Sequence, residues 1–139
     1  MKILFMCVAN SARSQLAEGL ARHLLPNTQI ESAGSNPGKL NPMAVKTMGE
    51  IGLDISKHHS KSVEDLPPQF VVGLNYVITL CAEEVCPMIL APTATRLHWP
   101  FPDPATKEPI SESESLRRFR KARDGIRKRL EEFKTEIEQ

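Results

Sequence analysis

The sequence has almost no net charge, no long apolar segment and no paired set of cysteines. Its formal net charge is +1, so it lacks the overall field that would attract nucleic acid or an acidic membrane surface. No apolar run approaches the roughly 20 residues that a membrane-spanning helix needs. The apolar start, MKILFMCV, is too short for a secretory signal. We therefore expect a cytoplasmic protein that binds neither nucleic acid nor membranes.

The chain has only three cysteines, an odd number that cannot form a closed set of disulfides. With 139 residues, 40% of them hydrophobic, it is long enough to bury one core without disulfides. We therefore predict a single domain over residues 1–139. In a reducing compartment, cysteines serve catalysis, redox exchange or metal binding, or are buried as small apolar side chains. The position of each cysteine in the fold decides between these uses.

Short apolar segments alternate with segments of helical periodicity. Buried strands are predicted at residues 2–8, 28–33, 76–80 and 96–99. Helices are predicted over residues 11–25, from 41 to about 52 and from 113 onward, with a capping box of Ser62 and Asp65 opening a short helix. This order predicts an α/β fold, a three-layer sandwich with a four-stranded parallel sheet and helices on both faces. Ligands bind at the carboxyl ends of such strands, where Cys7 and Cys81 lie.

The segment CVANSARS places a cysteine, five residues and an arginine between a predicted strand and a predicted helix. Consecutive backbone N–H groups in this position form a nest, backed by the positive end of the helix dipole. Such a nest fits a tetrahedral oxyanion. We predict that the oxyanion is bound by Val8, Ala9, Asn10, Ser11, Ala12, Arg13 and Ser14.

The same field favours the thiolate form of Cys7, which is the nucleophilic form. Arg13 adds a charged fork for two oxygens, Ser14 is expected to donate a hydrogen bond to the thiolate, and Asn10 to hold the loop. An acid is needed for the leaving oxygen, and the candidate is Asp103 in PFPDPA, where two prolines stiffen the loop. The alternatives are a buried strand cysteine and an ordinary turn aspartate.

Several segments together resemble one known family. MCVANSARSQLAEG and the distant DPA resemble the low-molecular-weight protein tyrosine phosphatase superfamily over nearly the whole chain. Within it, SARSQLAEG, the SAG at residues 32–34, and VITLCAEEVCP followed by LHWPFPDPA are similar to the thioredoxin-coupled arsenate reductases. The resemblance implies a flavodoxin-like fold, no metal or organic cofactor, and a role in arsenic resistance. We expect a monomer.

The resemblance also implies a reaction. Arsenate has nearly the shape and charge of phosphate, so phosphate or sulfate would mimic it in the nest. Cys7 attacks arsenic, a second thiol attacks the Cys7 sulfur and releases arsenite, and a third thiol takes over the disulfide by exchange. The resemblance implies that Cys81 is the second thiol and Cys86 the third, and that thioredoxin reduces the Cys81–Cys86 disulfide.

Three other interpretations stay open. A phosphatase acting on phosphotyrosine or a small phosphate ester needs only Cys7, but this chain has one Tyr and one Trp to stack on a phenol ring. A non-catalytic redox sensor would use Cys81 and Cys86 to control binding to a partner. A zinc site formed with His98 is disfavoured, because two Cys and one His without a second close pair is poor zinc spacing.

Some members of the resembled family bind potassium beside the loop, through residues that match Asn10, Glu18 and Ser32 and an aspartate at the position of Lys61. Here the Lys61 ammonium replaces that aspartate, so we expect an ion pair towards Glu18 or the loop and no potassium dependence.

The remaining unusual residues have structural interpretations. His58 and His59 are interpreted as surface or packing residues, and Trp99 as a core residue. The basic segment RRFRKARDGIRKR is interpreted as the solvated face of an amphipathic helix, because acidic residues follow at once and the apolar periodicity continues through it. Gly125 inside this helix is mildly unfavourable, which indicates close packing at that point.

Overall fold

The computed structural model describes residues 1–82 and 89–138. The elements in chain order are β1 (Lys2–Cys7), α1 (Arg13–Leu24), β2 (Gln29–Gly34), α2 (Pro42–Gly49), the 3-10 turn η1 (Val63–Asp65), α3 (Pro68–Val71), β3 (Tyr76–Thr79), β4 (Thr95–His98) and α4 (Glu112–Ile137). Among the helices of the described ranges, none is both long enough and apolar enough to cross a membrane.

The four strands form one parallel sheet in the order β2-β1-β3-β4, as predicted. The chain leaves β1 towards β2 on one side and later returns to pair β3 on the other side. The carboxyl end of β1 is therefore a switch point, where neighbouring connections diverge and leave a crevice. The loop that carries the CVANSARS motif starts at this point.

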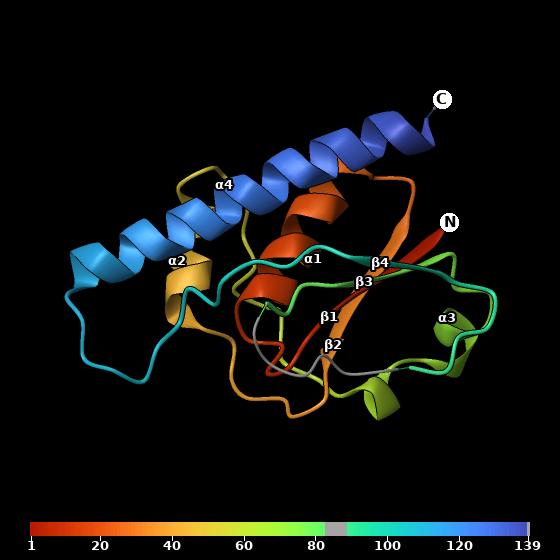
Figure 1. Ribbon diagram of the computed structural model, residues 1–139, viewed down its shortest axis with the longest axis horizontal. Helices are drawn as coiled ribbons and strands as arrows, with labels where there is room; N and C mark the ends of the chain where they lie inside the picture. Colours follow the sequence, from red (N-terminus) through yellow and green to blue (C-terminus); the bar gives the residue numbers. More distant parts are fainter. Residues whose placement is uncertain (83–88, 139) are drawn as a thin grey trace.

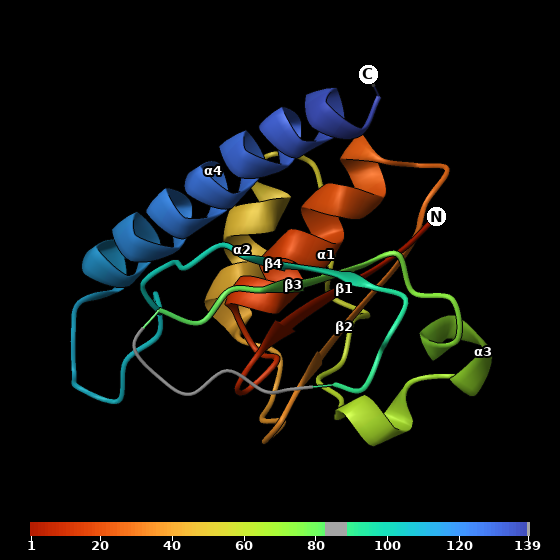
Figure 2. The same ribbon diagram turned by 45° about the vertical axis from the view of Figure 1, so that its right-hand side comes forward.

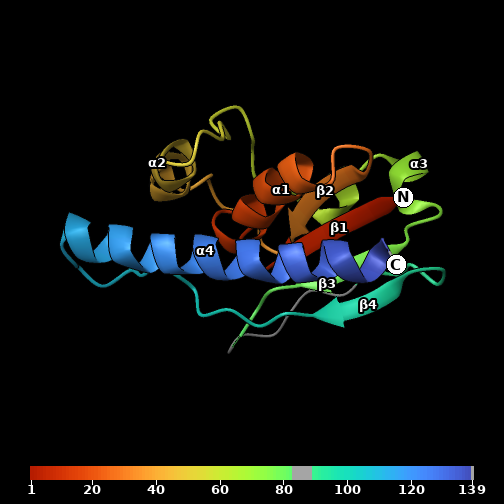
Figure 3. The same ribbon diagram turned by 90° about the horizontal axis from the view of Figure 1, so that it is seen from above.

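The two faces of the sheet are covered unequally. The helices α1, α2 and α4 lie on one face, and the short elements η1 and α3 lie on the other (Figures 1 and 2). Seen from above, α4 runs lengthwise along the molecule, on the viewer's side, and it contacts α1 (Figure 3). Helices on both faces were predicted and are found, although α3 itself was not foreseen, because four residues are too few for helical periodicity to be recognised.

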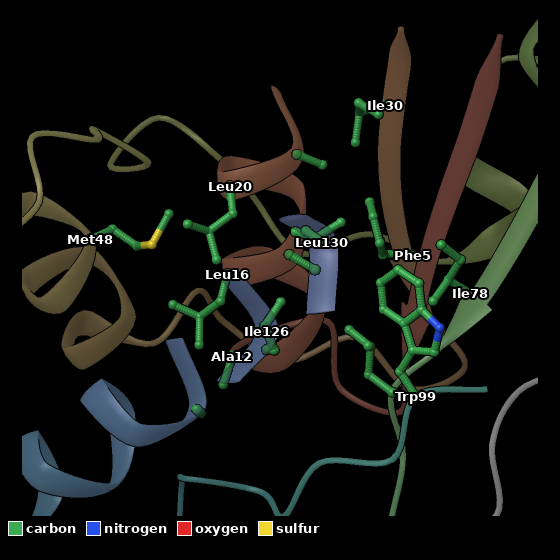
Figure 4. Close-up of a cluster of buried hydrophobic side chains, with 14 of the residues drawn as sticks. Phe5, Ala12, Leu16, Leu20, Ile30, Met48, Ile78, Trp99, Ile126 and Leu130 are labelled. Carbon is green, nitrogen blue, oxygen red and sulfur yellow. The ribbon is translucent and has the colours of Figure 1, made fainter. Parts of the chain in front are cut away.

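Successive residues of β1 point into two different hydrophobic clusters. Ile3 and Phe5 face the cluster beneath α1 and α4, whereas Leu4 and Met6 face the cluster beneath α3. Both faces of the strand are buried, which explains why it reads as a continuous apolar run rather than an alternating one. Figure 4 shows the larger cluster, in which Phe5 lies close to Trp99.

Helix ends follow local signals. The Oδ1 of Asn41 accepts a hydrogen bond from the amide of Met43 at 2.8 Å, as expected of an N-cap. The predicted capping box of Ser62 and Asp65 is present at η1. Helix α4 begins one residue before the predicted start at residue 113, because Ser111 rather than a later serine caps it.

Trp99 is a core residue, as interpreted from the sequence. Its ring lies 5.5 Å from that of Phe133, and the guanidinium carbon of Arg129 lies 4.6 Å over its centroid. The apolar stripe of α4 is buried while its basic residues Arg117, Arg120, Lys121, Arg127 and Lys128 are exposed. The amphipathic interpretation of this helix is therefore confirmed.

Leu130 and Leu90 give a matched test of this packing. Leu130 is fully buried beneath α4 and Leu90 is 89% exposed. Leu130→Ala is expected to lower the free energy of unfolding by about 2–5 kcal/mol, because it leaves a cavity in the core. Leu90→Ala is expected to change it by less than about 0.5 kcal/mol. Urea unfolding monitored by circular dichroism measures both, and equal losses would contradict this description of the core.

Candidate active site

The loop after β1 packs against a residue that has no side chain. A Cβ on Gly34 would lie 2.4 Å from the carbonyl oxygen of Val8 and 2.9 Å from the amide nitrogen of Asn10. Any other residue at the end of β2 would therefore push the loop away from the sheet. The amide of Gly34 is also bonded, at 3.0 Å, to the carbonyl of Lys61, which fixes the strand end from the other side.

The carbonyl groups of the loop are occupied on its outer side. Those of Val8, Ala9 and Ser11 each accept a 2.9 Å hydrogen bond, from the amides of Asn36, Gly38 and Asn41 respectively. In a trans peptide unit the N–H points opposite to the carbonyl. The amides that follow these carbonyls therefore point away from the 36–41 segment, which is the arrangement that an anion-binding nest requires.

A cavity of about 190 Å³ lies at the loop. It is lined by Cys7, Val8, Ala9, Ser11, Ala12, Arg13 and Asp103. Helix α1 opens onto this loop, and its N-cap position, Ala12, has no side chain that could cap the first turn. The helix's free amide donors and the positive end of its dipole are thus available to an anion.

Cys7 is a free, buried thiol held by a polar chain. Its Sγ lies 2.9 Å from the Oγ of Ser14, and the Nδ2 of Asn10 donates to the same Oγ at 2.7 Å. The serine oxygen accepts from the asparagine and keeps its own hydrogen, which can donate to a thiolate at Cys7. The predicted contact of Ser14 with the cysteine is thus present.

Asn10 holds the loop by its conformation and its side chain. Its φ of 49° lies in the left-handed region, which asparagine tolerates better than most residues. Its Oδ1 accepts from the amide of Lys61 at 3.0 Å, and its carbonyl accepts from the Oγ of Ser60 at 2.6 Å. Asn10 therefore ties the loop to residues 60 and 61, in addition to its bond to Ser14.

Arg13 is 4% exposed, and its guanidinium is fixed by backbone oxygens. Nη1 donates to the carbonyl of Phe101 at 2.9 Å and to that of Leu80 at 3.4 Å. Nη2 lies 3.7 Å from the Oδ2 of Asp103, whose side chain is 46% exposed. The structure thus brings Asp103 to the cavity of Cys7 and Arg13, although Asp103 is distant from both in the sequence.

Cys81 is buried and follows the end of β3, as the sequence predicted. The amide of Leu80 donates to the carbonyl of Met6 at 3.0 Å, so the residues just before Cys81 and Cys7 lie side by side. Cys81 therefore lies at the carboxyl end of the strands, where Cys7 begins the loop. Cys86, the other predicted redox residue, lies outside the described residues.

A buried ionic cluster lies behind the loop. The Oε1 of Glu18 accepts from the Oγ of Ser32 at 2.6 Å and lies 3.6 Å from the Nζ of Lys61. The expected pairing of Lys61 with Glu18 is therefore present. Burial by itself raises the pKa of Glu18, but the Ser32 hydrogen bond and the charges nearby, those of Lys61, His58 and Arg22, together hold this pKa below its usual value.

Sequence reasoning missed the role of Gln15 and His58. The Nδ1 of His58 lies 3.1 Å from the Oε1 of Gln15, whose Nε2 donates to the carbonyl of Asn10 at 3.1 Å. Burial lowers the pKa of His58, which keeps the ring neutral and able to donate to an amide oxygen. His58 is thus a neutral packing residue that supports the loop through Gln15. Its spacing from Gln15 in the sequence gives no signal of this contact.

A thiol under a backbone nest at a parallel-strand switch point is typical of enzymes whose cysteine attacks a tetrahedral oxyanion. The model of the low molecular weight phosphotyrosine protein phosphatase family matches residues 2–139. The chain belongs to this family.

Individual relatives and solved structures to which the chain is similar are arsenate reductases. An arsenate reductase of Bacillus licheniformis is 42% identical over 134 residues, which cover 94% of this chain and 93% of that protein. A solved arsenate reductase in its phosphate-binding state superposes with a TM-score of 0.78 at 31% identity, covering 99% of both chains. A thioredoxin-dependent arsenate reductase of Corynebacterium glutamicum superposes with a TM-score of 0.66 at 27% identity, covering 99% of this chain and 63% of that one.

The ionic cluster makes the stability of the fold depend on pH. Glu18 has a lower pKa in the folded protein than in the unfolded chain, where it is about 4.3. Its contribution is therefore complete above about pH 5 and is lost as the pH falls. The difference in unfolding free energy between wild type and Glu18→Gln is expected to shrink on acidification. Urea unfolding from pH 7 to pH 3 measures it, with the exposed Glu131→Gln as control.

Lys61 gives a second test of the same cluster. Because the Lys61 ammonium lies beside Glu18, a potassium ion is not needed there. The melting temperature of the wild type is therefore expected to be equal in potassium chloride and in choline chloride. Lys61→Asp replaces the ammonium with a further carboxylate, so its melting temperature is expected to rise with potassium concentration. Lys57→Asp is the control that should not respond, because Lys57 lines the same surface cavity as Glu18 and Lys61 but forms no ion pair with Glu18 among the described contacts. A potassium response in the wild type would contradict the predicted independence.

Proposed function

We propose that this protein is a thioredoxin-coupled arsenate reductase of the cytoplasm, acting through Cys7, Cys81 and Cys86. The observation that carries the proposal is the second buried cysteine, Cys81, at the carboxyl end of the strands, where Cys7 begins the oxyanion loop. A phosphatase has no use for that cysteine, since water completes its reaction. The arsenate reductase relatives and the thioredoxin-dependent neighbour support the same conclusion.

Binding comes first. Arsenate carries oxygens in a tetrahedron, as phosphate does, and the cavity of about 190 Å³ accommodates an ion of this size. The loop amides and the start of α1 hold its charge, and Arg13 completes the cage with a guanidinium already aligned by two backbone carbonyls. A pre-aligned arginine loses little conformational entropy on binding.

The first chemical step forms a sulfur–arsenic bond. The thiolate of Cys7, with the Ser14 hydroxyl donating to it, attacks arsenic, and an arsenate oxygen leaves as water. Asp103, beside Arg13 at the cavity wall, supplies the proton that the leaving oxygen needs. No electrons have been transferred at this stage, and arsenic is still As(V).

The second step transfers two electrons. The Cys81 thiolate attacks the Cys7 sulfur, a Cys7–Cys81 disulfide forms, and the electron pair of the sulfur–arsenic bond passes to arsenic, which leaves as arsenite. Cys86 then attacks Cys81, freeing Cys7 and forming Cys81–Cys86. Thioredoxin reduces that disulfide by the same exchange and restores all three thiols.

A phosphatase function is the alternative supported by an observation, namely the family itself. The first step is the same with phosphate esters, so slow hydrolysis of small aryl phosphates is compatible with the proposal. Ala105 follows the Asp103–Pro104 pair, where the tyrosine phosphatases of the resembled family place aromatic residues around the site. A purely redox-sensing role would leave the oxyanion cavity without a use.

The test is arsenate-dependent NADPH oxidation with thioredoxin and thioredoxin reductase. The wild type should turn over repeatedly, and Cys7→Ser, Cys81→Ser and Cys86→Ser should each fall to background, because each removes one step of the relay. Aryl phosphate hydrolysis is the control: it should be lost in Cys7→Ser and kept in Cys81→Ser and Cys86→Ser. If the wild type does not turn over arsenate but hydrolyses aryl phosphates in a reaction that needs only Cys7, the protein is a phosphatase and the proposal is wrong.

A further inference from the structure

Gly125 lies in the middle of α4, where glycine is among the least favourable residues. Its position is explained by a neighbour from another part of the chain. A Cβ on Gly125 would lie 3.0 Å from Cε1 and 3.6 Å from Cδ1 of the Phe101 ring. The ring therefore rests on bare helix backbone, closer to the helix axis than any other residue at 125 would allow.

The backbone of Phe101 links this contact to the catalytic cavity. Its amide donates to the carbonyl of Leu80 at 3.1 Å, and its own carbonyl accepts from the Nη1 of Arg13 at 2.9 Å. Two residues further on, Asp103 lies at the cavity wall, 3.7 Å from Arg13. The height of Phe101 above the helix thus sets the position of a guanidinium ligand and of the proposed acid.

The helix side of the contact is held firmly. Phe119 and Ile126 are buried in the core, and the Nη1 of Arg123 donates to the carbonyl of Thr47 at 2.8 Å and to Glu50 at 2.9 Å. The two bonds of Arg123 fix α4 to α2 just before Gly125, and the burial of Phe119 and Ile126 anchors the same stretch of α4 in the core.

The loop side of the contact is open. A cavity of about 370 Å³ lies beside the ring, lined by Phe101, Pro102, Asp103, Pro104, Arg117, Arg118, Lys121, Ala122 and Gly125. A methyl group added at Gly125 would therefore push the ring by a few tenths of an ångström towards this space, and would leave the helix in place.

We propose that Gly125 and Phe101 are positioning residues, which together set the Arg13 guanidinium and the Asp103 carboxylate in the oxyanion site. Neither residue touches the substrate. The proposal rests on the proposed function only for the reaction that it tunes, because the position of Arg13 also governs the binding of any oxyanion, phosphate included. Gly125 thus costs the helix some stability, and in exchange it lets the Phe101 ring lie where the site needs it.

The test compares two glycine substitutions in helices. Gly125→Ala adds the methyl group that displaces Phe101, and Gly49→Ala adds one where nothing lies within 4 Å. Gly125→Ala is expected to weaken phosphate protection of Cys7 against alkylation and to lower arsenate kcat/KM by about tenfold or more, since small misplacements of binding groups are costly. Gly49→Ala is expected to change neither. A purely structural glycine would leave both values of Gly125→Ala at the wild-type level, which would overturn the proposal.

A second pair of variants separates displacement from general damage. In a Phe101→Leu background the shorter side chain makes room for the methyl group, so adding Gly125→Ala should change phosphate protection by less than about twofold. An undiminished effect in that background would overturn the proposal, because the loss would not pass through the ring. Phosphate protection does not need arsenate turnover, so a wild type that protects Cys7 but does not reduce arsenate would refute the proposed function and leave this inference to be judged on protection alone.

Discussion

The site depends on the close approach of two backbones, that of Gly34 at the end of β2 and that of the loop after β1. With no side chain between them, the loop can bond its carbonyls outward to residues 36–41 and turn the opposite amides away from them. A nest of amides then forms without any charged side chain inside it. Arg13 supplies a full positive charge from the rim, where it remains bonded to Phe101 and Leu80.

The two sides of the loop differ in whether their charges already have partners. In front, the cavity is open to an anion. Behind it, the carboxylate of Glu18 is already matched by Lys61 and Ser32, so the buried charge is internally satisfied. The neutral side chains of Gln15 and His58 connect this cluster to Asn10. The loop is therefore held from behind by bonds that do not compete for the substrate.

The two-electron chemistry that we propose adds one demand to this frame: a second thiol must reach the first. Parallel pairing of β1 and β3 meets it in part, because Met6 pairs with Thr79, so that Cys7 ends β1 and Cys81 follows β3 at the same end of the sheet. The proposed acid and the arginine are also positioned by the segment that lies beside the end of β3. Phe101 lies beside the end of β3 and binds Arg13, and Asp103 follows it by two residues.

Local signals along the chain were enough to predict the secondary-structure elements and the oxyanion loop. Apolar runs, helical periodicity and caps such as Asn41 are local signals, so strands, helices and the Cys7–Arg13 motif could be predicted from the sequence. Contacts between distant segments leave no such signal. Three contacts became visible only in the folded protein: Gln15 bonds His58, the carbonyl of Phe101 binds Arg13, and the bare backbone of Gly125 lies under the Phe101 ring. Side chains meet there because packed layers bring them together, and spacing along one chain does not encode that meeting.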